Sequence, residues 1–234
     1  MLSVRGLAAG YGRGEVLRGL DLVVAPGEIV AVLGRNGSGR STLAKAIAGQ
    51  LAWRGAIAWN GQPLQGRRAF EIARLGIGYV PESRDVFAGL TVRQNLALGI
   101  KPAGAGGAGA GWDEEGIYRL FPALRERAQI DAAVLSGGEQ QMLALGRCLM
   151  GAPTLVIVDE PTEGLAPALV QQVAACLDGL RSRGVAVLLM EQKLTIALSI
   201  ADRVLVLGHG TVVFEGTPQR LQQRDEIVRE WLQV

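Results

Sequence analysis

Short apolar runs alternate with amphipathic segments along most of this chain. The runs at residues 28–33, 154–158 and 185–190 are almost wholly apolar and strand-sized, as in strands buried on both faces of a parallel sheet. Helical patterns follow or separate them at residues 43–51, 67–74, 91–99, 113–127, 136–150, 167–183 and 193–201. This alternation predicts an α/β fold with a mainly parallel sheet and helices on both faces.

The first part of the chain has a different pattern. Residues 2–8, 16–24 and 55–59 read as strands separated by glycine-rich turns, which predicts an antiparallel β portion. Residues 76–80 and 203–207 add two further strands, and a hairpin is expected around 208–210. Residues 101–111 are almost entirely Gly and Ala, so they are interpreted as a flexible linker.

A glycine-rich loop joins the strand at 28–33 to the helix that follows it. Glycines at 34, 37 and 39 allow backbone N–H groups to surround phosphates, and the start of the helix adds further donors. Ser41 falls where a hydroxyl would bind Mg²⁺. The alternative, an ordinary turn, is disfavoured by the full spacing and the strand–loop–helix context. The loop therefore predicts nucleotide binding.

Arg40 departs from the pattern of such loops, which have lysine at this position. A guanidinium keeps the positive charge but is planar and wider than an ammonium group. The fit of this residue to the β- and γ-phosphates is therefore in question.

Two further segments carry candidate chemistry. Asp159 and Glu160 end a buried strand, where α/β sheets place their ligands. Asp159 is suited to hold Mg²⁺, and Glu160 to orient or deprotonate a water. Ser136, Gly137 and Gly138 open a helix and present free N–H groups, which indicates either an anion site or simply a capped helix.

Composition narrows the functional classes. The chain has 234 residues, 49% of them hydrophobic, and a formal net charge of +2, so nothing indicates nucleic acid as a partner. Cys148 and Cys176 lie far apart in apolar segments and are expected to be reduced core residues. Without a leader or a membrane-length apolar run, the chain is expected to be cytoplasmic.

The three motifs, Gly34–Thr42, Leu135–Gln141 and Leu155–Pro161, together resemble the ATP-binding subunits of ABC transporters over essentially the whole chain. Residues 79–87, 163–167 and 190–192 most resemble the branched-chain amino-acid importer branch. The resemblance implies a P-loop NTPase (RecA-like) core with a helical insert that carries the signature motif. It implies one nucleotide-binding domain over 1–234, with the core at 1–80 and 151–234 and a helical subdomain at about 82–150.

The resemblance also implies ligands and residue roles. ATP and Mg²⁺ are the expected cofactors, and Tyr11, otherwise an ordinary turn residue, is expected to stack on the adenine. Glu160 and Gln192 are the expected catalytic residues, and Ser41, Asp159 and Glu82 the expected Mg²⁺ residues. The expected nucleotide-binding residues are Tyr11, Gly34, Arg35, Asn36, Gly37, Ser38, Gly39, Arg40, Ser41 and Thr42. The residues expected to contact the ATP of a partner chain are Ser136, Gly137, Gly138 and Glu139.

The implied partners are two transmembrane permease subunits, a second ABC ATPase and a separate solute-binding protein. The chain would then lie on the inner face of the cell membrane, with the loop at residues 82–87 against the permease. Such subunits form head-to-tail dimers, and both heterodimers and homodimers are possible here. Glu82 and Gln192 stand where most ABC proteins have glutamine and histidine, which this branch tolerates.

Arg40 affects only the site built on this chain's own loop, because the signature serves the partner. The sequence therefore predicts a motor in which this site binds ATP and hydrolyses it slowly or not at all. The alternatives are an importer ATPase for urea or short amides, and a regulatory ATP-binding subunit without hydrolysis. An ABC protein of DNA repair or chromosome structure is disfavoured, because the chain has neither heptads nor surplus positive charge.

Overall fold

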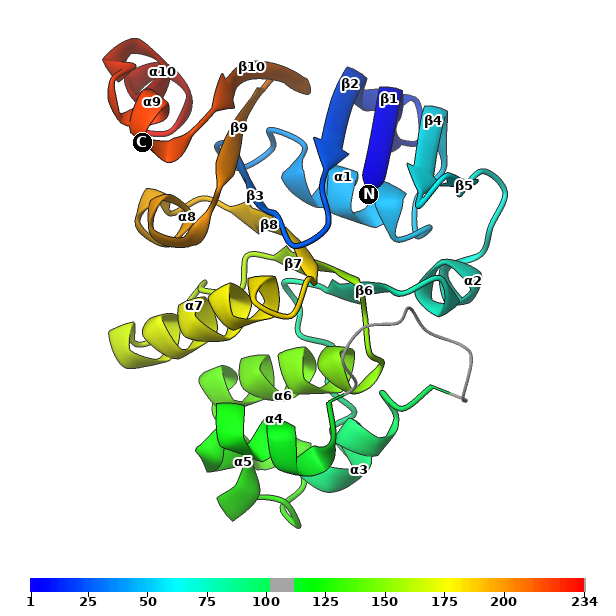
Figure 1. Ribbon diagram of the computed structural model, residues 1–234, viewed down its shortest axis with the longest axis vertical. Helices are drawn as coiled ribbons and strands as arrows, with labels where there is room; N and C mark the ends of the chain where they lie inside the picture. Colours follow the sequence, from blue (N-terminus) through cyan, green and yellow to red (C-terminus); the bar gives the residue numbers. More distant parts are fainter. Residues whose placement is uncertain (102–111, 234) are drawn as a thin grey trace.

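The computed structural model describes residues 1–101 and 112–233, and the protein forms two β-sheets with helices around them (Figure 1). The larger sheet has six strands in the order β10-β9-β3-β8-β7-β6. All neighbours in it are parallel except β9 and β10. Its strands are β3 (Ile29–Leu33), β6 (Ile77–Val80), β7 (Leu155–Asp159), β8 (Ala186–Glu191), β9 (Arg203–Gly208) and β10 (Thr211–Gly216).

The smaller sheet is antiparallel and has four strands in the order β2-β1-β4-β5. Its strands are β1 (Leu2–Tyr11), β2 (Gly14–Val24), β4 (Trp53–Trp59) and β5 (Gln62–Pro63). Helix α1 (Arg40–Ile47) lies between the two sheets and contacts strands of both (Figure 1). Its position fixes the loop that precedes it relative to both sheets.

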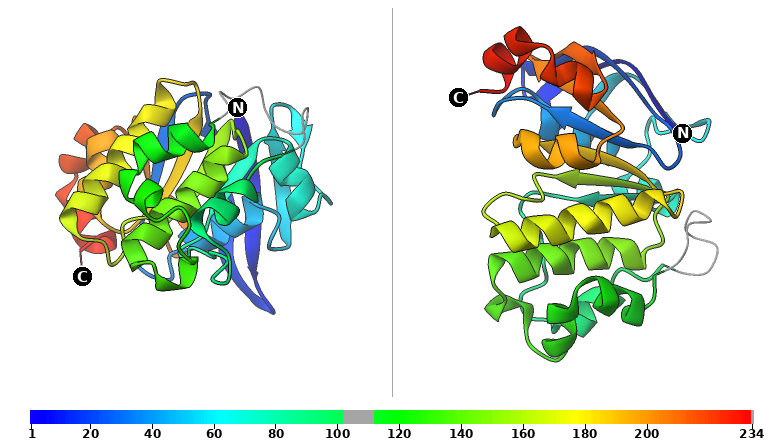
Figure 2. Two further views of the ribbon diagram at one scale, coloured as in Figure 1. Left: turned by 90° about the horizontal axis from the view of Figure 1, so that it is seen from below. Right: turned by 60° about the vertical axis from the view of Figure 1, so that its left-hand side comes forward.

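The remaining helices lie mostly on the other face of the six-stranded sheet, with α6 and α7 stacked below it (Figure 2). The long helices are α6 (Gly137–Met150) and α7 (Pro167–Arg181). The shorter ones are α2 (Ala69–Arg74), α3 (Val92–Ala97), α4 (Glu114–Leu120), α5 (Pro122–Glu126), α8 (Leu194–Ile200), α9 (Pro218–Gln222) and α10 (Asp225–Trp231). Helices α3, α4 and α5 all pack on α6.

The central strands explain both layers. In β3, Ile29, Ala31 and Leu33 face the core between the sheet and helices α6 and α7. Val30 and Val32 face the opposite core, which includes α1. A strand with apolar side chains on both faces can be buried only between two covering layers. The predicted α/β class, with a mainly parallel sheet and an antiparallel portion at the start, is confirmed.

Several predicted boundaries were wrong. The single helix expected at 113–127 is two helices, because Phe121 leaves the helical region with φ −130° and Pro122 starts a new helix. Strand β1 extends through residues 9–11, which were expected to form a turn, because its ladder with β2 continues to Gly14. Helix α1 ends at Ile47 rather than near Leu51. The chain leaves the helix there, because Gly49 takes φ +72°.

Other sequence expectations have different outcomes. The division into a core and a helical subdomain stays a prediction. The linker expected at 101–111 lies, apart from Lys101, outside the described residues. Within the described ranges, no helix is both long and apolar enough to cross a bilayer.

Cys176 is buried in the core, as expected, whereas Cys148 is only partly buried. Burial raises the pKa of the Cys148 thiol to about 11 and that of Cys176 to about 12. Because only the thiolate reacts rapidly, we expect both thiols in the folded chain to react with an aromatic disulfide reagent at pH 8 at least about a hundredfold more slowly than in urea. Rapid labelling of either cysteine in the folded chain would contradict this placement.

Candidate functional site: a phosphate loop facing a carboxylate edge

The loop between β3 and α1 lines a cavity of about 370 Å³ at the carboxyl edge of the six-stranded sheet. Gly37 and Gly39 have φ of +81° and +110°, which side chains disfavour, and a Cβ at Gly39 would lie 2.6 Å from Leu17. Ser38 lines this cavity, and its buried hydroxyl has no hydrogen-bond partner among the described residues. A loop of this shape with a free buried hydroxyl fits a phosphate ligand.

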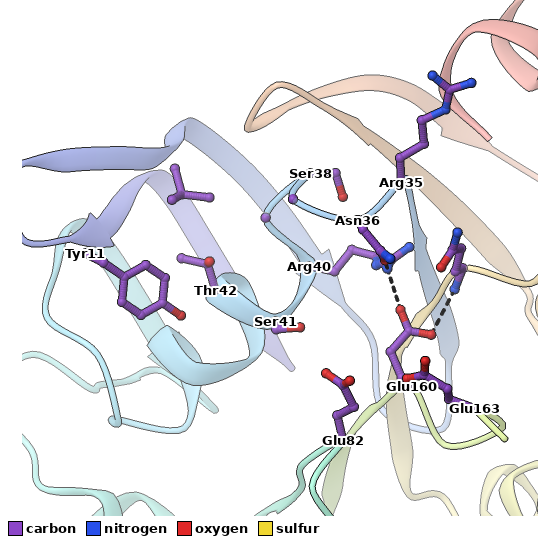
Figure 3. A pocket seen from close by; sticks show the side chains of 14 residues that line it. Tyr11, Arg35, Asn36, Ser38, Arg40, Ser41, Thr42, Glu82, Glu160 and Glu163 are labelled. Carbon is purple, nitrogen blue, oxygen red and sulfur yellow. Dashed lines mark hydrogen bonds and ion pairs between the residues drawn. The ribbon is translucent and has the colours of Figure 1, made fainter. Parts of the chain in front are cut away.

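The cavity brings together most of the residues that the sequence predicted (Figure 3). Tyr11 lies at one end and is 52% exposed, and Glu160 lies at the other. Gln192 is beside Glu160, because its N–H donates to Glu160 Oε2 at 3.3 Å. Other predicted residues that line it are Arg35, Asn36, Gly37, Ser38, Gly39, Arg40, Ser41, Thr42 and Glu82. Glu163, which was not predicted, also lines it. The exposure of Tyr11 leaves its ring free to meet a ligand.

Ser41 and Asp159 form the candidate magnesium position. The Ser41 hydroxyl donates to Asp159 Oδ1 at 3.1 Å, and burial raises the pKa of the Asp159 carboxyl. A hydroxyl and a carboxylate at this distance fit Mg²⁺, which prefers few protein oxygens and completes its shell with water and phosphate. The described residues contain no group of three or more His, Cys, Asp or Glu side chains that could hold a metal.

Glu82 and Glu160 differ in their surroundings. Burial and the neighbouring Glu163 raise the pKa of Glu82. Glu160 is 10% exposed, and burial raises its pKa to about 7 although the Arg40 charge acts in the opposite direction. Its backbone takes φ +47°, which is uncommon for a non-glycine residue, and its N–H donates to the Met190 carbonyl at 3.0 Å. The chain thus holds this carboxylate in a fixed position.

Arg40 does not point into open space. Its Nη1 donates to the carbonyls of Gly34 and Glu191, and its Nη2 donates to Asn36 Oδ1 at 3.3 Å. Nη2 also forms an ion pair with Glu160 Oε1, and the Arg40 side chain is 6% exposed. The guanidinium therefore joins the loop to the ends of β7 and β8.

The signature residues Ser136–Glu139 lie elsewhere. They do not line this cavity but start α6, where the Ser136 hydroxyl accepts from the Glu139 N–H at 3.3 Å. Glu139 in turn accepts from the Ser136 N–H at 2.7 Å, which completes a capping box. The structure thus separates the signature from the loop of the same chain.

Comparison with known proteins identifies the family. The sequence pattern of the family described as "ABC transporter" matches residues 17–163. The chain belongs to the ABC transporter family. It is 42% identical, over 93% of both chains, to the high-affinity branched-chain amino acid transport ATP-binding protein BraG of Pseudomonas aeruginosa. It is 34% identical to a probable branched-chain amino acid transport ATP-binding protein, LivF, of Archaeoglobus fulgidus, over 97% of this chain and 96% of that protein.

Solved structures agree with this assignment. A nucleotide-free ATP-binding cassette from an ABC transporter superposes with a TM-score of 0.83, at 25% identity, over 98% of this chain and 97% of the other. The structure of an ATP binding subunit of an ABC transporter gives a TM-score of 0.81 at 30% identity, over 97% and 94%. The resemblance stated from the motifs is confirmed, and the chain is an ATPase subunit of an ABC transporter.

Glu191 is a buried site residue of this ABC transporter subunit to which the sequence analysis gave no role. It is 1% exposed, and its carboxylate accepts from the N–H groups of Gln192 and Lys193, both at 3.2 Å. It also accepts from the Thr162 hydroxyl at 3.0 Å. Glu191 therefore ties the segment after β7 to the segment after β8. Its only sequence signal is a charged residue that ends an apolar strand.

Replacement of Glu191 by methionine leaves these three donors without their acceptor. We expect Glu191→Met to lower the free energy of unfolding by about 2–4 kcal/mol, measured by urea denaturation. Glu191→Gln is the matched control, because its amide oxygen can accept from both N–H groups and its amide nitrogen can donate to Thr162. If both variants lose the same stability, the hydrogen bonds do not hold these segments together.

Proposed function

We propose that this chain is the ATP-binding subunit of an ABC importer for branched-chain or other hydrophobic amino acids. The observation that carries the proposal is the cavity in which the glycine-rich loop faces Glu160, with Asp159 hydrogen-bonded to the Ser41 hydroxyl beside it. The solute class is supported by the printed functions of the relatives that are 42% and 34% identical. An importer of urea or short amides is the alternative.

Each residue of the cavity has a role that follows from its position. The Tyr11 ring stacks on the adenine at one end of the cavity, and the N–H groups of residues 37–42 hold the phosphates. Ser41 and Asp159 hold Mg²⁺, with Glu82 in reach through water, and the ion when bound neutralises charge on the phosphates. Glu160 positions and deprotonates the attacking water, and the Gln192 amide donates to the terminal phosphate.

The subunit works in a head-to-tail dimer. Because Ser136–Glu139 lie outside the cavity of their own chain, these residues are free to complete the ATP site of a second ABC ATPase. A heterodimer fits the altered loop best, since Arg40 then affects one of the two sites. In a homodimer Arg40 would stand in both sites.

Arg40 makes ATP hydrolysis slower at the site on this chain's own loop than at the site on the partner's loop. The guanidinium is bound to Gly34, Asn36, Glu191 and Glu160, so it is held by protein groups rather than directed at phosphate. This chain then chiefly binds nucleotide and supplies its signature to the partner. A regulatory subunit without any hydrolysis is the limiting case, and the retained Glu160 argues against it.

Exchange of arginine for lysine tests the slower site. We expect Arg40→Lys to raise steady-state ATP hydrolysis by the purified chain with Mg²⁺ by about tenfold or more, because an ammonium reaches the terminal phosphates. In the heterodimer, Glu160→Gln should lower hydrolysis much less than the same change in the partner. Equal hydrolysis by wild type and Arg40→Lys, or an equal loss from the two Glu→Gln changes, would contradict the proposal.

The loop at residues 82–87 is proposed to contact the permease. The buried Asn95 side chain fixes its end, accepting from the Phe87 N–H at 2.9 Å and donating to the Phe87 carbonyl at 3.0 Å. Arg147 donates to the Asp85 carbonyl at 2.7 Å and lies over the Phe87 ring. The ring remains 52% exposed beside a hollow of about 420 Å³. A rigid loop that presents an apolar ring suits protein docking.

Membrane vesicles that contain the subunit with its two permeases and solute-binding protein test this contact and the solute. We expect Phe87→Ser to lower ATP-dependent leucine uptake by about tenfold, through loss of an aromatic anchor, while ATP binding by the isolated chain is unchanged. Val23→Ser is the control, because Val23 is also an exposed apolar residue but lies on β2, away from this loop. Uptake of urea but not leucine would favour the alternative solute class.

A further inference from the structure

The ion pair between Arg40 and Glu160 crosses one end of the nucleotide cavity (Figure 3). Both side chains are buried, with exposures of 6% and 10%. Arg40 comes from the start of α1, and Glu160 directly follows β7. The pair therefore closes the space between the phosphate loop and the carboxylate edge of the sheet.

This end of the cavity is where the last phosphate of a bound triphosphate would lie. A nucleotide whose base stacked on Tyr11 would run along the loop toward Arg40 and Glu160, which lie at the other end of the cavity. Hydrolysis requires a water between Glu160 and the terminal phosphate. The guanidinium is in direct contact with the carboxylate, so a water and a terminal phosphate placed there would have to separate the pair.

A nucleoside triphosphate and a nucleoside diphosphate would affect this ion pair differently. A third phosphate would have to draw Arg40 away and would leave Glu160 as an unpaired buried carboxylate, next to the Glu191 carboxylate, which is 1% exposed. Breaking a buried ion pair in this way is costly, and like charges add repulsion. A diphosphate ends one phosphate earlier along the loop and leaves the pair intact.

We propose that the Arg40–Glu160 ion pair takes the place of the terminal phosphate, so that this chain's own site prefers nucleoside diphosphates to triphosphates. The inference rests on the proposed nucleotide-binding function and specifies which ligand this site retains. Within the motor, the site would hold a diphosphate for most of the cycle, and the partner's site would respond to ATP.

The preference is measured by calorimetric titration of the purified full chain, with Mg²⁺, using ADP and the β,γ-imido analogue of ATP. We expect the wild type to bind ADP on the order of tenfold more tightly than the analogue. In Arg40→Lys the ratio should fall to one or below, because a lysine can leave Glu160 and follow the phosphate. Arg54→Lys is the matched control, since Arg54 pairs with Glu15 at 2.7 Å on the surface and does not line this cavity, and it should keep the wild-type ratio.

Glu160→Gln provides a second arm that leaves the loop unchanged. Removing the negative charge frees Arg40, so the ratio should again shift toward the analogue, and a double-mutant cycle with Arg40→Lys should show non-additive shifts. The inference is overturned if the wild type binds the analogue as tightly as ADP, if Arg54→Lys shifts the ratio as much as Arg40→Lys, or if the shifts of Arg40→Lys and Glu160→Gln simply add. Failure to bind either nucleotide would overturn the proposed function itself, whereas hydrolysis equal to that of Arg40→Lys would overturn only the slow site.

Discussion

The parallel pairing of β3, β8 and β7 is the constraint on which the site depends. Because parallel strands end at the same edge, the segments that follow them must meet there. Leu33 pairs with Glu191, and Asp159 pairs with Met190, so the register brings the phosphate loop, Glu160 and Gln192 to one place. Ser41 and Asp159, which are 118 positions apart in the sequence, become neighbours through this strand pairing.

The burial of α1 between the two sheets makes this edge rigid. Its apolar side chains pack into the core that lies between β3 and the antiparallel sheet, so the helix start is held from both sides. Gly39 precedes it in a conformation that only glycine adopts easily, against Leu17 of β2. The antiparallel sheet therefore does more than carry Tyr11, because it also fixes the position from which Arg40 extends.

The sequence predicted the class of the fold and most of the cavity, because both follow from local patterns. A continuous apolar run predicts a buried strand, and a glycine spacing after it predicts a phosphate loop, whatever the rest of the chain does. The break at Pro122 could have been predicted from its missing N–H, but the amphipathic pattern across it was given more weight. The extension of β1 through Tyr11 depends on its ladder with β2, which no local pattern shows.

The partners of buried polar side chains could not be predicted in this way. Arg40 was recognised as unusual, but its bonds to Glu191 and Glu160 depend on the register of three strands. Glu191 and Thr162 face each other across 3.0 Å only because β7 and β8 are neighbours. A residue type at a given spacing predicts chemistry, whereas the identity of its partner is a property of the packed structure.

The guanidinium suits this place because of the carboxylates around it. Asp159 and Glu191 are each 1% exposed and Glu160 is 10% exposed, so three acidic side chains are buried at one edge. Burial and the neighbouring Glu191 carboxylate raise the pKa of Glu160, whereas the Arg40 charge acts in the opposite direction. An ammonium offers three donors from a single point, but a planar guanidinium can reach carbonyls of the loop and of β8 and a carboxylate after β7 at once. Arg40 thus stabilises this edge of the sheet, and the same contacts would oppose the arrival of another negative group.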